Sequence, residues 1–296
     1  MNSAELLQQQ LNAPRTRKPR GVRPDLSNGI QYNADLQRIV RAVNRDINGI
    51  LMPVVRNIAP EYQRDAEAVT LDSWVDVLAA ALRQVRARYE TPRFTAFVES
   101  IARKFVTTAN NSNRRRTERD LGINIYSDSQ RLQDYLTMAT RNNVTLIQSI
   151  PAQYLTQVES IVMANIRAGL RPAVIARQLQ DQFGVTERRA KMIARDQVNK
   201  INSNLASMRI KDVGYKYFKW ETSNDERVRD RHEDVSKRVT AYGKGVYRFD
   251  NPPIVDQNLP QLPGEPIQCR CVMIPISEEE VKENQRKGLT DPSVKR

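Results

Sequence analysis

The sequence predicts a mainly α-helical protein with a C-terminal α+β module, in which long helices precede a small antiparallel sheet and a Pro/Gly-rich loop. Apolar residues recur every three or four positions from Ala34 to Val213, the period of helices with one buried face. After Gly214 the period falls to two over residues 215–221, as in a β-strand. The one histidine and both cysteines also lie beyond that point. The chemically versatile side chains are therefore concentrated in the predicted module.

The composition favours a polyanionic or acidic partner without identifying one. The 296 residues include 47 lysines and arginines against 34 aspartates and glutamates, a net charge of +13. Such a charge attracts nucleic acid through its phosphates, and it also attracts acidic protein surfaces. No run approaches the ~20 apolar residues that span a bilayer, and residues 1–24 lack the apolar core of a secretion signal. We therefore expect no membrane segment and no secretion.

Two basic segments are candidates for contact with DNA or with an acidic protein. Residues 1–33 are expected to form an extended arm, because three prolines disfavour a helix and the like charges repel one another. A disordered tail and a partner-bound arm are both compatible with this composition. The second segment ends a helix that opens at Pro92, and there a solvated helix end is the alternative. The candidate contact residues are Arg15, Arg17, Lys18 and Arg20 in the arm, and Arg114, Arg115, Arg116 and Arg119 in the helix.

Prolines and glycines predict where several helices end. Pro53 should stop or kink the first helix, and an apolar segment at 144–150 should stop before Pro151. A helix opening at Pro172 should end at Gly184, and Thr186 should cap the next one. Two helices joined so closely resemble a helix-turn-helix, which makes DNA binding the alternative function. A short turn containing glycine is also an ordinary connection between packed helices, so we favour a scaffold.

The predicted module brings together residues that could bind a metal ion. A helix over 225–232 would place Asp225, Arg229 and His232 on one face. A final strand over 267–274 would place Cys269 and Cys271 on one face. If the histidine lies opposite the thiols, the three suit Zn²⁺ with a carboxylate as fourth ligand. The candidates for that fourth ligand are Asp225, Asp230 and Glu233.

Packing is the alternative to a metal, and catalysis is the weakest interpretation. The cysteines could be small buried hydrophobes and the histidine a hydrogen-bonded core residue. A Cys/His nucleophile would need a base and an oxyanion site, and no motif for either is visible. We therefore expect no enzyme, no catalytic residue and no small-molecule substrate, with zinc as the one candidate cofactor. The cluster expected to hold the module together comprises Trp220, Asp225, Arg229, His232, Gly264, Cys269 and Cys271.

Over about residues 145–276 the sequence resembles the phage Mu F-like minor head proteins, a head-morphogenesis family of tailed bacteriophages. The motifs that carry the resemblance occur in order along the chain. They are Ile147-Gln-Ser-Ile-Pro151, Gly169 with Pro172, Gly184-Val-Thr-Glu-Arg-Arg-Ala190, Ile193-Ala-Arg195, Trp220-Glu-Thr222, Asp225-Glu-Arg-Val-Arg229, His232, Pro263-Gly264 and Cys269-Arg-Cys271.

This resemblance implies a structural minor capsid protein, present in few copies in the virion and made in the host cytoplasm. Its implied partners are the portal, capsid or scaffold proteins, together with non-specifically bound double-stranded DNA that some members accompany at ejection. We expect four parts in the chain. They are an arm at 1–33, a helical region at 34–145, a Mu F-like module at 146–276 (helices at 153–213, an α+β part at 215–276) and a charged tail at 277–296.

Overall fold

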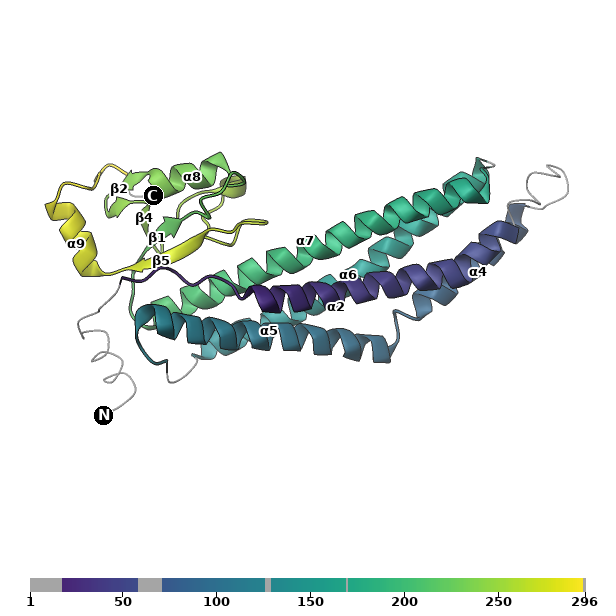
Figure 1. Cartoon of the computed structure of the whole chain (residues 1–296), viewed down its shortest axis with the longest axis horizontal. Helices are drawn as coiled ribbons and strands as arrows, with labels where there is room; N and C mark the ends of the chain where they lie inside the picture. The colour runs from purple at the N-terminus through teal and green to yellow at the C-terminus, as the bar shows by residue number, and fades with distance from the viewer. Residues whose placement is uncertain (1–17, 58–70, 126–128, 169, 295–296) are drawn as a thin grey trace. The chain divides into compact units, whose positions relative to one another are not determined.

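The computed structural model describes residues 18–57, 71–125, 129–168 and 170–294, with the side chains of residues 71–74 excepted. Long helices precede a small antiparallel sheet, which confirms the predicted fold class. The helical part comprises α2 (Leu26–Asp46), the π-helical turn η1 (Ile47–Leu51), α4 (Leu71–Ala87), α5 (Pro92–Leu121), α6 (Gln130–Arg167) and α7 (Pro172–Asp212) (Figure 1). None of the helices in these ranges is long and apolar enough to cross a lipid bilayer.

The chain forms two compact units, each built from segments that are separated in the sequence. The four parts expected from the sequence were consecutive stretches of the chain. Unit 1 comprises Met1–Gly29, Phe105–Ala139 and Arg195–Arg296. Unit 2 comprises Ile30–Lys104 and Thr140–Ala194. Helices α2, α5, α6 and α7 each have residues in both units.

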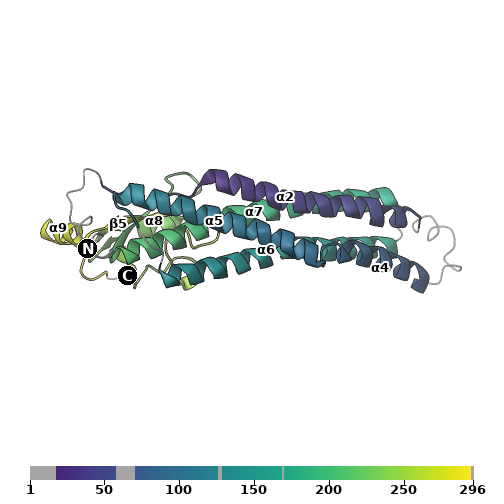
Figure 2. The same cartoon turned by 90° about the horizontal axis from the view of Figure 1, so that it is seen from below.

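Unit 2 is a helical bundle with an apolar core and a few buried polar ties. Its helices lie side by side in both views (Figures 1 and 2). Tyr32 Oη donates to Asn143 Oδ1 at 2.8 Å, and Tyr154 Oη donates to Asn44 Oδ1 at 3.0 Å. Each tie joins α2 to α6, so they fix the pairing of these two helices within the bundle. The apolar residues packed around them include Leu36, Val40, Val43, Leu78, Val85, Ile147, Ile150 and Val158.

The predicted extended arm is wrong in its end point: residues 18–25 form no helix or strand, but the chain is helical from residue 26. Helix α2 begins at Leu26, not at Ala34, because Asp25 accepts hydrogen bonds from both the backbone N–H and the hydroxyl of Ser27 and so caps the first turn. The residues before it are packed into unit 1. Gly21 N–H donates to Asp120 at 3.0 Å, and the carbonyl of Val22 accepts from Asn202 at 2.7 Å. Arg15 and Arg17 lie outside the described residues.

Helices continue past both prolines, although Pro53 was predicted to stop or kink its helix and Pro151 to end one. The π-helical turn Ile47–Leu51 interrupts the regular α-helix just before Met52 and Pro53, and the chain continues as helix to residue 57. Helix α6 runs unbroken through Pro151. A helical proline costs about 3 kcal/mol through its missing N–H and its ring. In α6, Ile147 and Tyr154 are buried on either side of it, and this tertiary packing overrides the local preference.

Helix α7 is continuous, which contradicts the helix-turn-helix interpretation. The predicted turn at residues 184–186 lies within the helix. Thr186, expected to be an N-cap, instead donates its hydroxyl to the carbonyl of Gln182 at 2.9 Å, a bond made inside a helix. No second, separately oriented recognition helix follows Gly184.

A Gly184→Ala substitution tests this continuity. A Cβ at position 184 would meet only Arg188 Nη1, at an ordinary contact distance of 3.5 Å. Alanine should therefore raise the free energy of unfolding by about 0.5–1 kcal/mol, since glycine is the poorer helix former. Gly214→Ala is the matched control, because Gly214 follows α7 with a φ of +94° and alanine should destabilise there. Urea unfolding measures the free energy of unfolding of both variants. A loss of stability in Gly184→Ala would indicate that a turn interrupts the helix at Gly184.

The module of unit 1 is built on a three-stranded antiparallel sheet of order β4-β1-β5. Strand β1 (Tyr217–Glu221) is central and buries Phe218 and Trp220 on one face, which confirms the predicted alternation. Tyr217 pairs with Arg248 of β4 on one side and with Ile276 of β5 on the other. The other elements are β2 (Val239–Thr240), β3 (Gly243–Lys244), β4 (Val246–Arg248), β5 (Val272–Ile276), helix α8 (Asp230–Lys237) and the 3-10 turn η2 (Asp256–Asn258).

The tail at 277–294 is partly helical and docked. Helix α9 (Glu278–Arg286) begins with a capping box between Ser277 and Glu280 and buries Val281. Asn284 donates to the carbonyl of Tyr242 at 3.0 Å, which ties α9 to the β2–β3 hairpin. Residues 122–125, which follow α5, form no strand.

Candidate metal centre

His232 lies in the first turn of α8, and the predicted helix over 225–232 is wrong in its first half. Asn224 has a φ of +54°, and Asp225 Oδ1 accepts the backbone N–H of Arg227 at 3.0 Å. These features form an aspartate-closed turn that competes with helix formation. Arg229 is extended, with φ −72° and ψ 144°, and α8 begins only at Asp230. Asp225, Arg229 and His232 therefore share no helical face.

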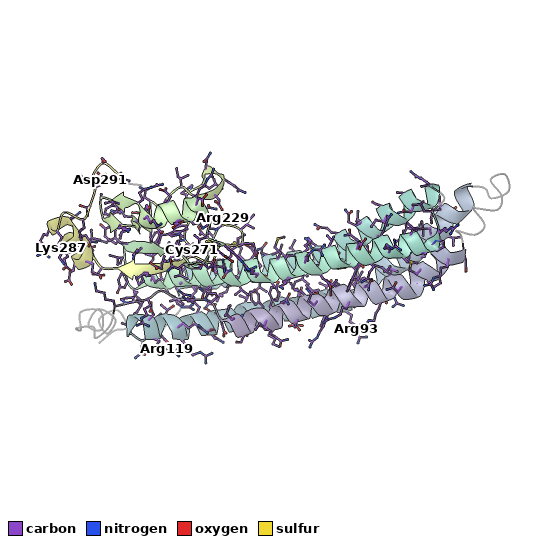
Figure 3. All side chains as sticks on the ribbon, turned by 45° about the horizontal axis from the view of Figure 1, so that its top comes forward. Arg93, Arg119, Arg229, Cys271, Lys287 and Asp291 are labelled. Atoms are coloured by element: carbon purple, nitrogen blue, oxygen red, sulfur yellow. The ribbon has the colours of Figure 1, made fainter. Side chains whose placement is uncertain are left out.

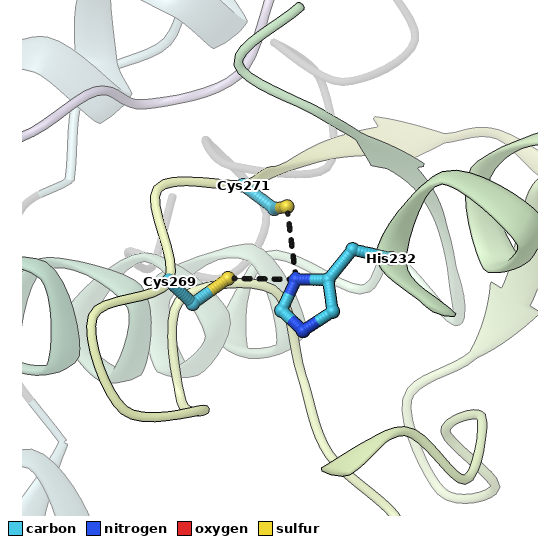
Figure 4. Close-up of side chains that lie close together, drawn as sticks. All are labelled: His232, Cys269 and Cys271. Atoms are coloured by element: carbon cyan, nitrogen blue, oxygen red, sulfur yellow. Dashed lines mark hydrogen bonds between the residues drawn. The ribbon is translucent and has the colours of Figure 1, made fainter. Parts of the chain in front are cut away.

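The two cysteines precede β5 in a loop, so the strand face predicted for them is also wrong. Gln268 has a φ of +58°, and its backbone N–H donates to Asp196 of α7 at 2.8 Å. This left-handed residue turns the chain, and both thiols still point towards His232 (Figure 4). The convergence expected from the sequence is present, although its local geometry differs.

The three side chains meet at one imidazole nitrogen. Cys269 Sγ and Cys271 Sγ each lie 3.5 Å from His232 Nδ1. All three residues are buried, with exposed fractions of 3% for His232, 3% for Cys269 and 6% for Cys271. Among the described residues, this is the one group of three or more His, Cys, Asp or Glu whose ligand atoms are close enough to share an ion.

The carboxylates expected as fourth ligand lie elsewhere. Asp225 pairs with Arg270 at 2.6 Å, and that hydrogen bond lowers the pKa of Asp225. Glu233 pairs with Lys237 one turn along α8. Neither of them, nor Asp230, belongs to the converging group. The proposed fourth-ligand role of Asp225 is therefore wrong.

Asp256, which the sequence did not indicate, holds the far side of the imidazole. Its Oδ2 lies 3.5 Å from His232 Nε2 and accepts a 2.8 Å hydrogen bond from Arg229 Nη1. Arg229 also donates to the carbonyl of Ile267 at 2.5 Å. Arg229 Nη1 itself lies 3.4 Å from Nε2, so this ring nitrogen faces both the carboxylate and the guanidinium. No local pattern marks Asp256, because it lies in an irregular loop and reaches the histidine only through the fold.

Trp220 and Gly264 complete the surroundings. The Trp220 ring packs edge-on against His232 with centroids 5.6 Å apart. The buried Trp220 Nε1 makes no hydrogen bond with another described residue. Gly264 N–H donates to Cys269 Sγ at 3.4 Å. The sulfur of Cys269 therefore faces an N–H group that stabilises negative charge.

The electrostatics separate the two thiols. The hydrogen bond from Cys271 lowers the pKa of Cys269 against the effect of burial, and His232 lowers it further. The hydrogen bond to Cys269, together with burial, raises the pKa of Cys271. Burial alone would lower the pKa of His232, but the hydrogen bond to Cys269 and the charges of Cys269 and Asp256 outweigh it and raise that pKa. The site therefore favours a thiolate beside a positive charge.

The basic residues predicted to contact a partner have different surroundings. Lys18 lies 3.4 Å from Glu280, and Arg20 uses its backbone N–H to bind Asp120 at 2.8 Å. Arg114 lies 3.6 Å from Glu118, and Arg116 lies 3.6 Å from Asp25. Of the four candidate arginines of α5, all of them described, Arg115 and Arg119 are exposed without an acidic partner among the described residues. Arg119 is labelled in Figure 3.

Comparison with known proteins supports the resemblance seen in the sequence. Residues 156–274 match the family model described as Phage Mu protein F like protein. An uncharacterized protein of Haemophilus influenzae (strain ATCC 51907 / DSM 11121 / KW20 / Rd) is 29% identical over 283 residues. The alignment covers 93% of this chain and 59% of that relative, so this chain spans little more than half of its length. No solved structure matches the chain.

The matched segment contains all of α7, most of the three-stranded sheet and the whole His/Cys cluster. The motifs that suggested the family, from Gly184 to Cys271, therefore lie on a single helix and the module that follows it. Residues 156–274 of this chain are therefore similar to the phage Mu F-like family, in agreement with the resemblance seen in the sequence.

Proposed function

We propose that this chain is a structural minor head protein of a tailed bacteriophage, located at the portal vertex and the capsid interior. The observation that carries the proposal is the Mu F-like match over residues 156–274. The module supports it, because its scarce reactive side chains are buried together in one cluster. A role in assembly fits such a site better than catalysis does.

Association with the portal protein of the same phage tests this proposal. We expect the full chain and the portal protein to co-elute when they are co-expressed. Co-expression with the major capsid protein provides the comparison. Co-elution with the portal supports the proposed location. Separate elution from both proteins under assembly conditions would contradict it.

A non-specific contact with packaged DNA is a second part of the proposal. Arg115 and Arg119 are four residues apart on α5, and this spacing places both guanidinium groups on one side of the helix. Because they are exposed and lack an acidic partner among the described residues, their charges remain available for phosphates. Such contacts neutralise phosphates without reading bases, which fits packaged DNA of any sequence.

The Arg115→Glu/Arg119→Glu double substitution should weaken binding to random-sequence double-stranded DNA. If each arginine neutralises one phosphate, the slope of log affinity against log salt should fall in magnitude by about 2. Lys282→Glu/Arg286→Glu is the matched control, because it makes the same charge change at the same spacing on the exposed side of α9. Equal losses of DNA affinity in both double variants would indicate a general charge effect and would contradict a specific DNA contact by α5.

A further inference from the structure

We propose that His232 Nδ1, Cys269 Sγ and Cys271 Sγ bind one Zn²⁺ ion, and that this ion ties α8 to the loop before β5. The inference concerns the stability of the module and stands independently of the proposed role in the phage head. It differs from the expectation drawn from the sequence, because it excludes Asp225 and assigns a supporting role to Asp256.

The two nitrogen–sulfur distances fit a metal. Tetrahedral zinc with Zn–N of about 2.0–2.1 Å and Zn–S of about 2.3 Å separates the nitrogen from each sulfur by about 3.6 Å. The observed separations are 3.5 Å for both Cys269 and Cys271. A single Nδ1–H could donate well to only one of two sulfurs, whereas a cation between the three atoms attracts all of them. The arrangement is therefore that of ligands around a centre.

The surrounding groups are those that support a metal site. Zinc-binding histidines almost always donate their other ring N–H to a carboxylate, carbonyl or water, which fixes the tautomer. Asp256 lies 3.5 Å from His232 Nε2 and is itself held by Arg229 at 2.8 Å. The N–H of Gly264 donates to the sulfur of Cys269 at 3.4 Å, which offsets part of the negative charge of a thiolate.

The ligand set selects the class of metal. One imidazole and two thiolates are borderline-to-soft donors and suit Zn²⁺, whereas Mg²⁺ and Ca²⁺ require oxygen ligands. The described residues supply three ligands, so water is the simplest fourth one. A small hollow that adjoins Cys271, lined also by Ser203, Pro263 and Met273, has room for about one water molecule.

Such an ion would link distant parts of the module. His232 and Cys269 are 37 residues apart in sequence, and the irregular loop at 250–266 lies between them. Because the unfolded chain has no preformed site, the binding free energy of the metal adds to the stability of the folded module. The ion would therefore hold closed a region that contains little regular hydrogen bonding of its own.

Zinc content of the full-length protein tests the site. After refolding with zinc and removal of free metal, we expect about one zinc per folded wild-type chain, with a lower thermal midpoint in excess chelator. Replacement of zinc by Co²⁺ should give a thiolate-to-cobalt charge-transfer band. A folded wild-type protein that retains no zinc, shows no cobalt–thiolate band and has the same midpoint with chelator would overturn the proposal, and the cluster would then be held by packing.

Variants test the assignment of the ligands. Cys271→Ser should lose stoichiometric zinc. Asp256→Asn should keep the three ligands but weaken zinc binding by about 10–100-fold in competition with a chromophoric chelator. Asp225→Asn is the matched control, because Asp225 pairs with Arg270 outside the cluster and its change should leave zinc affinity unaltered. Loss of zinc in Asp225→Asn together with full affinity in Asp256→Asn would overturn the assignment.

Discussion

Replacement of Trp220 by alanine is expected to lower the free energy of unfolding by about 3–5 kcal/mol, the usual range for an aromatic residue removed from a packed core. Trp220 is fully buried in the central strand β1 and shares the module's core with Phe218, Val235, Met273 and the two cysteines. Its ring also packs edge-on against His232. The substitution therefore leaves a large cavity and removes the contact that orients the imidazole.

Chemical unfolding followed by circular dichroism measures this loss. Phe97→Ala provides the control, because Phe97 is an aromatic residue of α5 that is 47% exposed and should cost much less. If both substitutions cost the same, Trp220 would not be the centre of the module core.

Gly264→Ala is expected to destabilise the protein by more than 2 kcal/mol, because two effects coincide at this position. Gly264 has a φ of +92°, which side chains rarely adopt, and a Cβ there would lie 2.7 Å from Ser203 Cβ on α7. The Ser203 hydroxyl donates to the carbonyl of the preceding residue, Pro263, so the serine has little freedom to retreat. The loop and α7 would have to move apart.

Gly122→Ala separates the two effects. Gly122 also has a positive φ, +65°, but a Cβ there would meet nothing within 4 Å. Its substitution should cost only the conformational penalty, about 1–2 kcal/mol. Thermal unfolding of both variants gives the difference, and equal shifts would show that the loop does not press against Ser203.

Periodicity predicted the fold class because long regular patterns report the dominant packing. The three-to-four-residue spacing of buried positions such as Val158, Val162 and Ile166 predicted helices, and alternation predicted that Phe218 and Trp220 share one face of β1. Both signals depend on which face of an element is buried. They carry no information about where an element ends, because its ends depend on tertiary contacts.

Element ends could not be predicted for that reason. Pro151 and Gly184 are local helix breakers, yet both lie inside helices that are buried along much of their length. At Asp225 the opposite happened: the predicted helix does not form there. The Asp225 carboxylate accepts a backbone N–H in a turn and pairs with Arg270. Side-chain hydrogen bonds and long-range packing decided each case.

The sequence predicted the three candidate ligand residues of the site, but it did not predict the residue that contacts the far side of the imidazole. The scarcity of histidine and cysteine drew attention to His232, Cys269 and Cys271, and the fold brings them together. Asp256 could not be found, because an aspartate in an irregular loop has no distinguishing local pattern and acts only through a contact with His232. Scarcity therefore pointed to the candidate ligands, whereas their surroundings depend on the complete fold.

Quantitative mass spectrometry of purified, DNA-filled heads tests the central claim most directly. The account predicts that peptides from this chain are present in the heads of the phage that encodes it, in few copies relative to the major capsid protein. Its absence from such heads, with the protein found only in the soluble fraction of producing cells, would contradict a structural role in the phage head.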